Sequence, residues 1–181
     1  MSSAEIKAIA MLLRARNAID ERIADVVGRP VVHGHLSDWI AAQVFDIALE
    51  PAANKVVDGF FRSGPLAGRS VNIKHYTRNQ GMLDMTDSEE LDTYLVMTGP
   101  RGGPSGSAGA YRPWSIEHVY LFDAQGLYDT LHAEMRRIGV ATSIPSRYWD
   151  QAEIHPVSRN ANFPLSAEQT AALEEFRAGR V

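Results

Sequence analysis

The sequence contains no cysteine. Disulfide bonds, thiolate nucleophiles and cysteine-based zinc sites are therefore excluded as explanations of its fold or function. The same absence fits a protein of a reducing compartment.

Long apolar runs are also missing. No stretch approaches the roughly 20 apolar residues that a membrane-spanning helix needs. The first 20 residues carry charges every few positions and lack the basic start, apolar run and small-residue cleavage site of a signal peptide. We therefore expect a cytoplasmic protein with no membrane partner.

The chain has no excess of positive charge, since 18 basic residues face 22 acidic ones, for a net charge of −4. This balance argues against a protein that coats nucleic acid by bulk charge, although a local basic groove on an acidic body is still allowed. Glycine-rich nucleotide-binding motifs of the GxGxxG or Walker type are absent as well. With 181 residues and 45% hydrophobic content, we expect a single domain over residues 1–181.

Hydrophobic periodicity and turn residues predict a mixed α/β layered fold without internal repeats. Two strands separated by a glycine- and proline-containing turn predict a hairpin. The expected helices are residues 4–27, 37–49, 124–138, 145–152 and 166–177, and the expected strands are residues 56–62, 71–76, 93–98 and 116–122. Residues 77–91 and 99–113 are expected to be loops, and Ser166 with Gln169 predicts a capping box at the last helix.

Polar side chains gather on the predicted hairpin. Strand alternation places Asn72 and Lys74, two residues apart, on the same side of the second strand, and the hairpin allows Asp58 of the first strand to lie beside them. A carboxylate and an amide oxygen are hard ligands suited to Mg²⁺. A nearby lysine can orient a water molecule or stabilise negative charge on a phosphate.

The same region resembles the PD-(D/E)XK restriction-endonuclease-like superfamily. The stretches that carry the resemblance are Gly34-His-Leu-Ser-Asp38-Trp-Ile-Ala, Asn54-Lys-Val-Val-Asp58-Gly and Val71-Asn72-Ile-Lys74. It implies a restriction-endonuclease-like mixed sheet, made of the hairpin and two further strands, flanked by helices and extended by helices at both ends. It also implies that Asp58 is the main metal-binding aspartate, that Lys74 is the catalytic lysine and that Asp38 is an auxiliary acid. Mg²⁺ or Mn²⁺ would be the cofactor, and nucleic acid, DNA rather than RNA, the substrate.

Asn72 departs from the family pattern, which has an aspartate or glutamate at this position. An amide oxygen can bind a metal but carries no charge, so the affinity for the metal should fall. In one hypothesis the chain is a metal-dependent nuclease in which another acid compensates, the candidates being Asp38, Glu50, Asp84 and Asp87. In the other it is a catalytically inactive nucleic-acid-binding or scaffold domain of the same fold. A homodimer would suit cleavage of both strands of a duplex, but the sequence does not decide whether two chains pair.

Basic and aromatic side chains follow the proposed site in the sequence. Such residues suit phosphate contacts and base stacking, and the alternative is a solvated loop surface. The candidate substrate-binding residues are Arg62, Tyr76, Arg78, Arg101 and Arg112. His33 and His35 before the second helix are interpreted as surface or capping residues, and His118 as a half-buried strand histidine.

Overall fold

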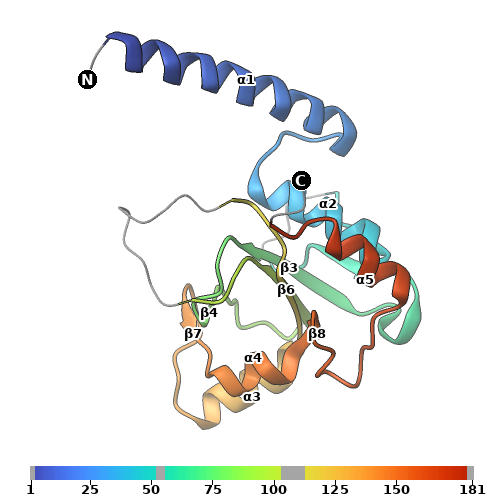
Figure 1. Cartoon of the computed structure of the whole chain (residues 1–181). Helices are drawn as coiled ribbons and strands as arrows, with labels where there is room; N and C mark the ends of the chain where they lie inside the picture. Colours follow the sequence, from blue (N-terminus) through green and yellow to red (C-terminus); the bar gives the residue numbers. More distant parts are fainter. Residues whose placement is uncertain (1–2, 52–55, 103–112, 179–181) are drawn as a thin grey trace.

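A mixed β-sheet forms the centre of the computed structural model, which describes residues 3–51, 56–102 and 113–178 (Figure 1). Its order in the described residues is β1-β2-β3-β5-β6-β8. The strands are β1 (Ile47–Leu49), β2 (Gly59–Phe61), β3 (Ser70–Tyr76), β5 (Thr93–Thr98), β6 (His118–Asp123) and β8 (Glu153–His155). β3 and β5 are parallel, and every other neighbouring pair is antiparallel.

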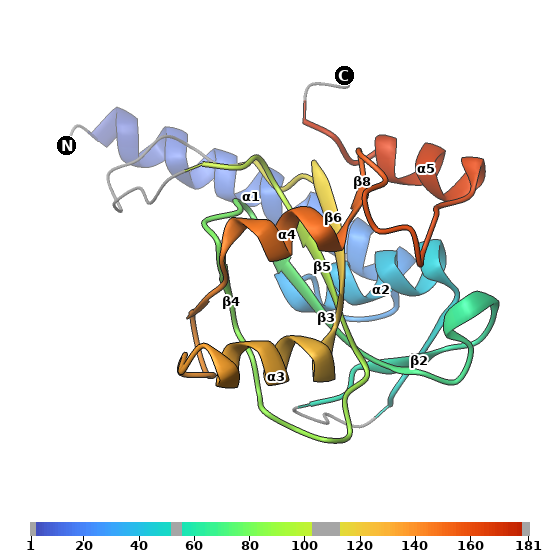
Figure 2. The ribbon, with the colours of Figure 1, turned by 90° about the horizontal axis from the view of Figure 1, so that it is seen from below.

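Helices cover both faces of this sheet. α2 and α5 lie over one face, and α3 and α4 lie over the other (Figure 2). Outside the sheet, β4 (Met82–Leu83) pairs with β7 (Thr142–Ser143). The helices are α1 (Ser3–Val27), α2 (His33–Phe45), α3 (Ala124–Ala133), α4 (Ser146–Ala152) and α5 (Ala167–Glu174), with a short 3₁₀ turn at Gly64–Leu66. No helix of the described chain is both long and apolar enough to cross a membrane.

Two apolar clusters hold the layers together. Strand alternation on β5, whose residues are all buried, sends Leu95 and Met97 to the α2 side and Tyr94 and Val96 to the α3 side. Such a strand, buried on both faces, is typical of the centre of a layered α/β sheet.

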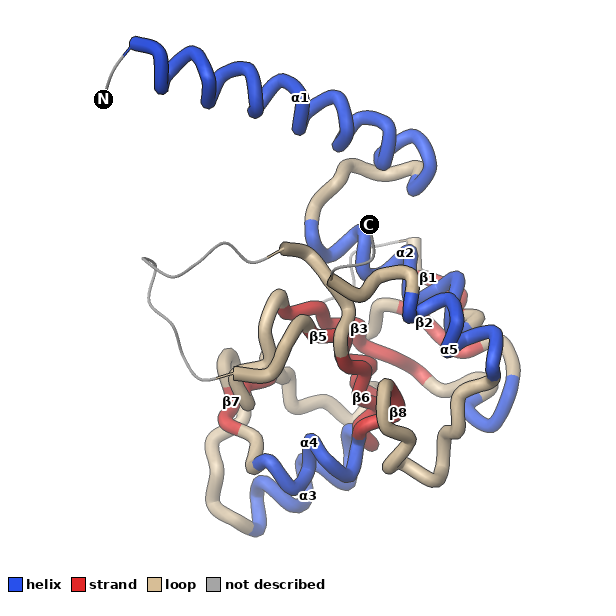
Figure 3. Tube along the Cα trace, viewed as in Figure 1, coloured by secondary structure: helices blue, strands red, loops and turns tan. Residues whose placement is uncertain are grey.

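The predicted α/β class and mixed sheet are confirmed. The strand expected at residues 93–98 has those bounds, and the Ser166–Gln169 capping box is present at α5. Residues 77–92 connect the parallel strands β3 and β5 through β4, with no helix between them (Figure 3).

The helix expected at residues 37–49 was wrong at its C-terminal end. α2 ends at Phe45, because Asp46 adopts a left-handed conformation (φ 53°) and its carbonyl oxygen accepts the backbone N–H of Arg62. The following residues form β1 instead of a last helical turn. The first hairpin strand is also shorter than expected, since β2 begins only at Gly59.

Gly59 is required by the close approach of β1 to β2. A Cβ at this position would overlap the carbonyl oxygen of Ala48 and lie 2.8 Å from Cγ2 of Ile47. The Asp-Gly pair of the sequence therefore allows two strands to pack closely beside Asp58.

We predict that Gly59→Ala destabilises the protein by about 1–3 kcal/mol, because the backbone of β1 must move to admit the methyl group. Gly34→Ala is the matched control, since it adds the same methyl group in α2, where no described atom outside the adjoining backbone of the helix lies within 4 Å. There the alanine should stabilise the helix by about 0.5–1 kcal/mol. Chemical denaturation measures both changes. Equal stability of the two variants would contradict this account of Gly59.

Candidate functional site

Asp58 occupies the point where β2 separates from β3. The β2–β3 ladder ends at the pair Gly59 and Val71, although the N–H of Asp58 still donates to the Val71 carbonyl at 2.9 Å. Two residues further along β3, at Ile73, the Asp58 carboxylate takes the place of the β2 backbone, as its Oδ2 accepts the Ile73 N–H at 2.6 Å. Because the two strands separate here, the Ile73 N–H of β3 has no backbone partner on β2, and the Asp58 carboxylate accepts it instead.

Asn72 lies buried next to this position, with 3% of its surface exposed. Its Nδ2 donates to the carbonyl oxygen of Val56 at 2.8 Å, which holds the segment before Asp58 against β3. Its Oδ1 is buried and has no hydrogen-bond partner among the described residues. A buried acceptor left unpaired costs about 1–3 kcal/mol, so this oxygen would be stabilised by a ligand.

Asp38 approaches the same site from α2, which packs on β3 through the buried residues Ile40 and Ala41. Burial, and secondly the nearby carboxylate of Asp58, raise the pKa of Asp38 from 3.8 to about 6. Arg29, His35 and Lys74 oppose this rise by electrostatic attraction. Asp38 therefore lies within electrostatic range of both hairpin residues that the resemblance singled out.

Lys74 projects from β3 two residues after Asn72 and is half-buried. Burial raises the pKa of Asp58, while the hydrogen bond from Ile73 and the positive charge of Lys74 counteract this rise. Asp38, Asp58 and Lys74 thus lie within electrostatic range of one another, while the printed contact of Asn72 is with Val56.

The oxygen donors at this site suit a hard cation, although only two of them, those of Asp38 and Asp58, are carboxylates. With Oδ2 of Asp58 taken by Ile73, its Oδ1 is left as a donor within electrostatic range of Asp38. Oδ1 of Asn72 is a third buried oxygen, on the α3 side of the sheet with Tyr94, the register partner of Asn72. Three oxygen donors with two formal negative charges match the preferences of Mg²⁺ and Mn²⁺. Within the described ranges, no group of three or more histidine, aspartate or glutamate side chains is arranged for a metal.

The other acids considered as substitutes lie differently. Glu50 reaches the site through its backbone, whose N–H donates to the carbonyl oxygen of Asp58 at 2.9 Å. Asp84 accepts the Ala141 N–H, and Asp87 pairs with His132 at 3.1 Å. Of the four candidates, Asp38 is the acid whose pKa responds to Asp58 and Lys74.

Most of the predicted substrate-binding residues have intramolecular contacts. Arg62 lies 3.6 Å from Asp46 beyond the far end of β2, and the Tyr76 hydroxyl accepts the Asp84 N–H at 2.9 Å. Arg78 lies against Gly102, where its guanidinium fills the space that a Cβ would occupy. Arg112 lies outside the described residues.

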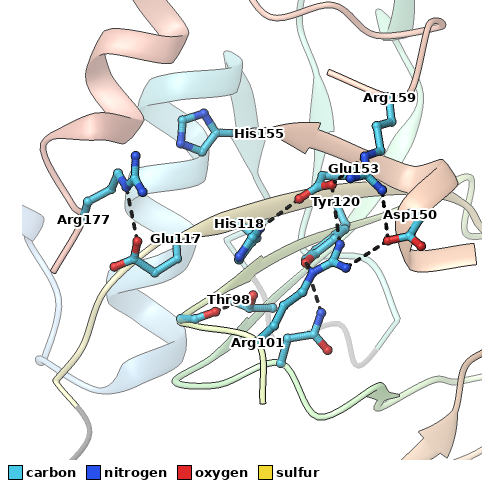
Figure 4. Close-up of polar contacts among 12 residues, drawn as sticks. Thr98, Arg101, Glu117, His118, Tyr120, Asp150, Glu153, His155, Arg159 and Arg177 are labelled. Atoms are coloured by element: carbon cyan, nitrogen blue, oxygen red, sulfur yellow. Dashed lines mark hydrogen bonds and ion pairs between the residues drawn. The ribbon is translucent and has the colours of Figure 1, made fainter. Parts of the chain in front are cut away.

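Arg101 belongs to a polar network around the buried Glu153 that sequence reasoning missed (Figure 4). Its guanidinium donates to the Tyr120 hydroxyl and to Asp150, and lies 3.5 Å from Glu153. Glu153 is only 2% exposed and also contacts His118 Nδ1 at 2.8 Å and Arg159 Nε at 3.3 Å. These partners come from four separate segments, so no local pattern could have indicated them. The network holds the end of the β5 loop against α4 and β8.

Comparisons with known proteins leave the chain without an assigned family. No protein-family model matches it, and a search of curated proteins finds no match.

The pKa of Asp38 predicts a specific pH dependence of stability. Because the carboxyl holds its proton more tightly in the folded state than at its usual pKa of 3.8, the free energy of unfolding falls as pH rises from about 4 to about 6. Asp38→Asn should therefore raise stability by about 1–2 kcal/mol at about pH 8, after allowance for solvent screening, and change it little at about pH 4.

Thermal unfolding in metal-free buffer at the two pH values measures this difference. Asp129→Asn is the control, since it removes an exposed aspartate on α3 and should have the same small effect at both. A destabilising effect of Asp38→Asn at the higher pH would contradict the assignment.

Proposed function

We propose that this chain is a nuclease-like hydrolase of phosphodiesters in nucleic acid, dependent on Mg²⁺ or Mn²⁺ and built on a restriction-endonuclease-like fold. The observation that carries the proposal is the Asp58 carboxylate bound to the Ile73 N–H, within electrostatic range of Lys74 and Asp38. Two carboxylates and an ammonium gathered beside an open strand edge fit that chemistry better than they fit a structural role.

Burial makes this grouping unfavourable in the absence of a ligand. The pKa of each carboxyl is raised mainly by loss of hydration, and the acids repel each other. A divalent cation would relieve both penalties and would lower the pKa of a bound water molecule. Asp58, Asp38 and Asn72 would bind and orient that cation through their oxygens.

Lys74 has the role of a positioning cation in this proposal. Its ammonium balances the carboxylates and would lie beside the phosphate, where it can stabilise charge that develops on a non-bridging oxygen. Arg29, whose charge also acts on Asp38, adds a second cation near the site. Local positive charge of this kind allows an acidic protein to bind a polyanion.

Nucleic acid is the proposed partner, with DNA preferred over RNA because of the resemblance to restriction endonucleases. Arg62, Tyr76, Arg78, Arg101 and Arg112 remain candidate contacts to it. Two copies acting together would suit cleavage of a duplex.

One observation favours the inactive alternative. Asn72 uses its amide nitrogen to fasten Val56, so the residue in place of the second acid has a structural task. A domain that lost this acid would still bind nucleic acid, with an affinity that falls as salt increases.

Cleavage of plasmid DNA, single-stranded DNA and RNA in Mg²⁺, Mn²⁺ or EDTA tests the proposal. We expect metal-dependent cutting by the unmodified chain and a loss of at least about 100-fold in Asp58→Asn and Lys74→Met. Asp129→Asn is the matched control for removal of a carboxylate and should cut at the normal rate. Circular dichroism checks that each variant is folded.

The outcomes separate the two functions. Binding without cleavage, together with cleavage gained by Asn72→Asp, would support the inactive domain. Cleavage that persists in both Asp58→Asn and Lys74→Met would contradict the proposed nuclease site. Absence of both binding and cleavage in every condition would contradict both functions.

A further inference from the structure

α1 projects from the rest of the molecule (Figure 1) and has no extensive contact with another element of the described chain. Its apolar side chains are therefore exposed to solvent, Ile9 to 57%, Leu12 to 66% and Ile19 to 56%. Isolated helices in water are only marginally stable unless an apolar face is covered. The helix therefore requires a partner surface.

The apolar residues of α1 follow a heptad pattern. Successive positions are spaced by three and four residues, which places them in one stripe along the helix. The stripe consists of Ile9, Leu12, Arg16, Ile19, Ile23 and Val26. Arg16 is its one polar member and lies at its centre, 3.4 Å from Asp20 on the same helix. A pattern of this kind is typical of a helix that pairs with another helix.

The second half of this stripe borders an apolar groove of about 380 Å³. Ile19, Ile23 and Val26 form one wall, and Trp39 of α2 and Phe176 contribute to the other. An amphipathic helix can lay its apolar face into a groove of this kind.

Charge along α1 identifies the helix that fits the groove. Residues 3–16 contain Lys7, Arg14 and Arg16 against one acid, for a net charge of +2. Residues 17–27 contain Asp20, Glu21 and Asp25 against one arginine, for a net charge of −2. An antiparallel arrangement of two α1 helices pairs the basic half of each with the acidic half of the other, whereas a parallel arrangement opposes like charges.

We propose that the chain forms a homodimer through antiparallel α1 helices, the N-terminal half of each lying in the apolar groove of the other copy. The heptad stripe sets the register, with Ile9 opposite Val26 and Leu12 opposite Ile23. Arg16 then lies near the two-fold axis, and a polar residue at such a position favours one register over others.

Sedimentation equilibrium of the full chain at about 1–100 μM tests the association. The expected mass is twice the 19.9 kDa of one chain. Leu12→Asp should weaken the dimer at least about 10-fold because it places a charge in the helix interface. Met11→Asp is the matched control, since Met11 is equally exposed at 65% but lies off the stripe, and this variant should remain dimeric.

Disulfide cross-linking tests the orientation, which is possible because the chain has no cysteine of its own. The double variant Ile9→Cys with Val26→Cys should give a covalent dimer on mild oxidation. The two positions of one helix are about 26 Å apart, too far for an internal bond. Ile9→Cys alone should stay uncross-linked, because in the antiparallel pair its two copies lie at opposite ends.

Four results would overturn the proposal. A monomeric mass at every concentration would show that no dimer forms. Equal weakening of the dimer by Leu12→Asp and Met11→Asp would show that the stripe is not its interface. Efficient cross-linking of Ile9→Cys alone replaces the antiparallel pair with a parallel one. A monomer that binds vesicles of phosphatidylcholine and phosphatidylglycerol, and loses this binding in Leu12→Asp, would assign the stripe to a lipid surface.

Discussion

The hydrogen bond between the Asp58 carboxylate and the Ile73 N–H is the interaction on which the candidate site depends. It lets a side chain replace the strand where β2 leaves β3, so that the backbone group of β3 stays satisfied while the sheet opens. Gly59, the residue after Asp58, permits the close approach of β1. Asn72 holds the segment before Asp58 against β3 through its hydrogen bond to Val56. A fixed carboxylate beside an opened strand edge is the result.

This arrangement leaves negative charge at the site only partly compensated in the folded protein. Asp38 and Asp58 are both partly removed from water and repel each other, and Lys74 compensates only in part. Because Oδ1 of Asn72 is also buried and has no hydrogen-bond partner in the described part of the chain, the site favours a species that supplies positive charge and accepts oxygen ligands. A divalent cation satisfies both requirements, and this is the physical basis of the proposed hydrolase. Because Asn72 carries an amide and not a carboxylate, it adds no negative charge to the site.

The sequence predicted those secondary-structure elements that have a local periodic or capping pattern. β5 and the helix at Ser166 were recognisable because buried strands and capping boxes have short signatures. Regular alternation along β3 places Asn72 and Lys74 on the same side of that strand, as predicted. β1 was not predictable, since Ile47 continues the apolar stripe of α2 and only the left-handed Asp46 ends that helix. The Arg101 network joins segments some 50 residues apart, from Arg101 to Asp150 and Glu153, which no local pattern reports. The position of Asp38 beside Asp58 followed from the family resemblance and not from periodicity.

A crystal structure obtained in Mn²⁺ above pH 6, with anomalous scattering measured for the metal, tests the central claim most directly. We expect a Mn²⁺ ion bound by Oδ1 of Asp58 with oxygens of Asp38 and Asn72, and Lys74 adjacent to it but not a ligand. A direct ion pair between Lys74 and Asp58 at this position, with no anomalous signal, would contradict the account.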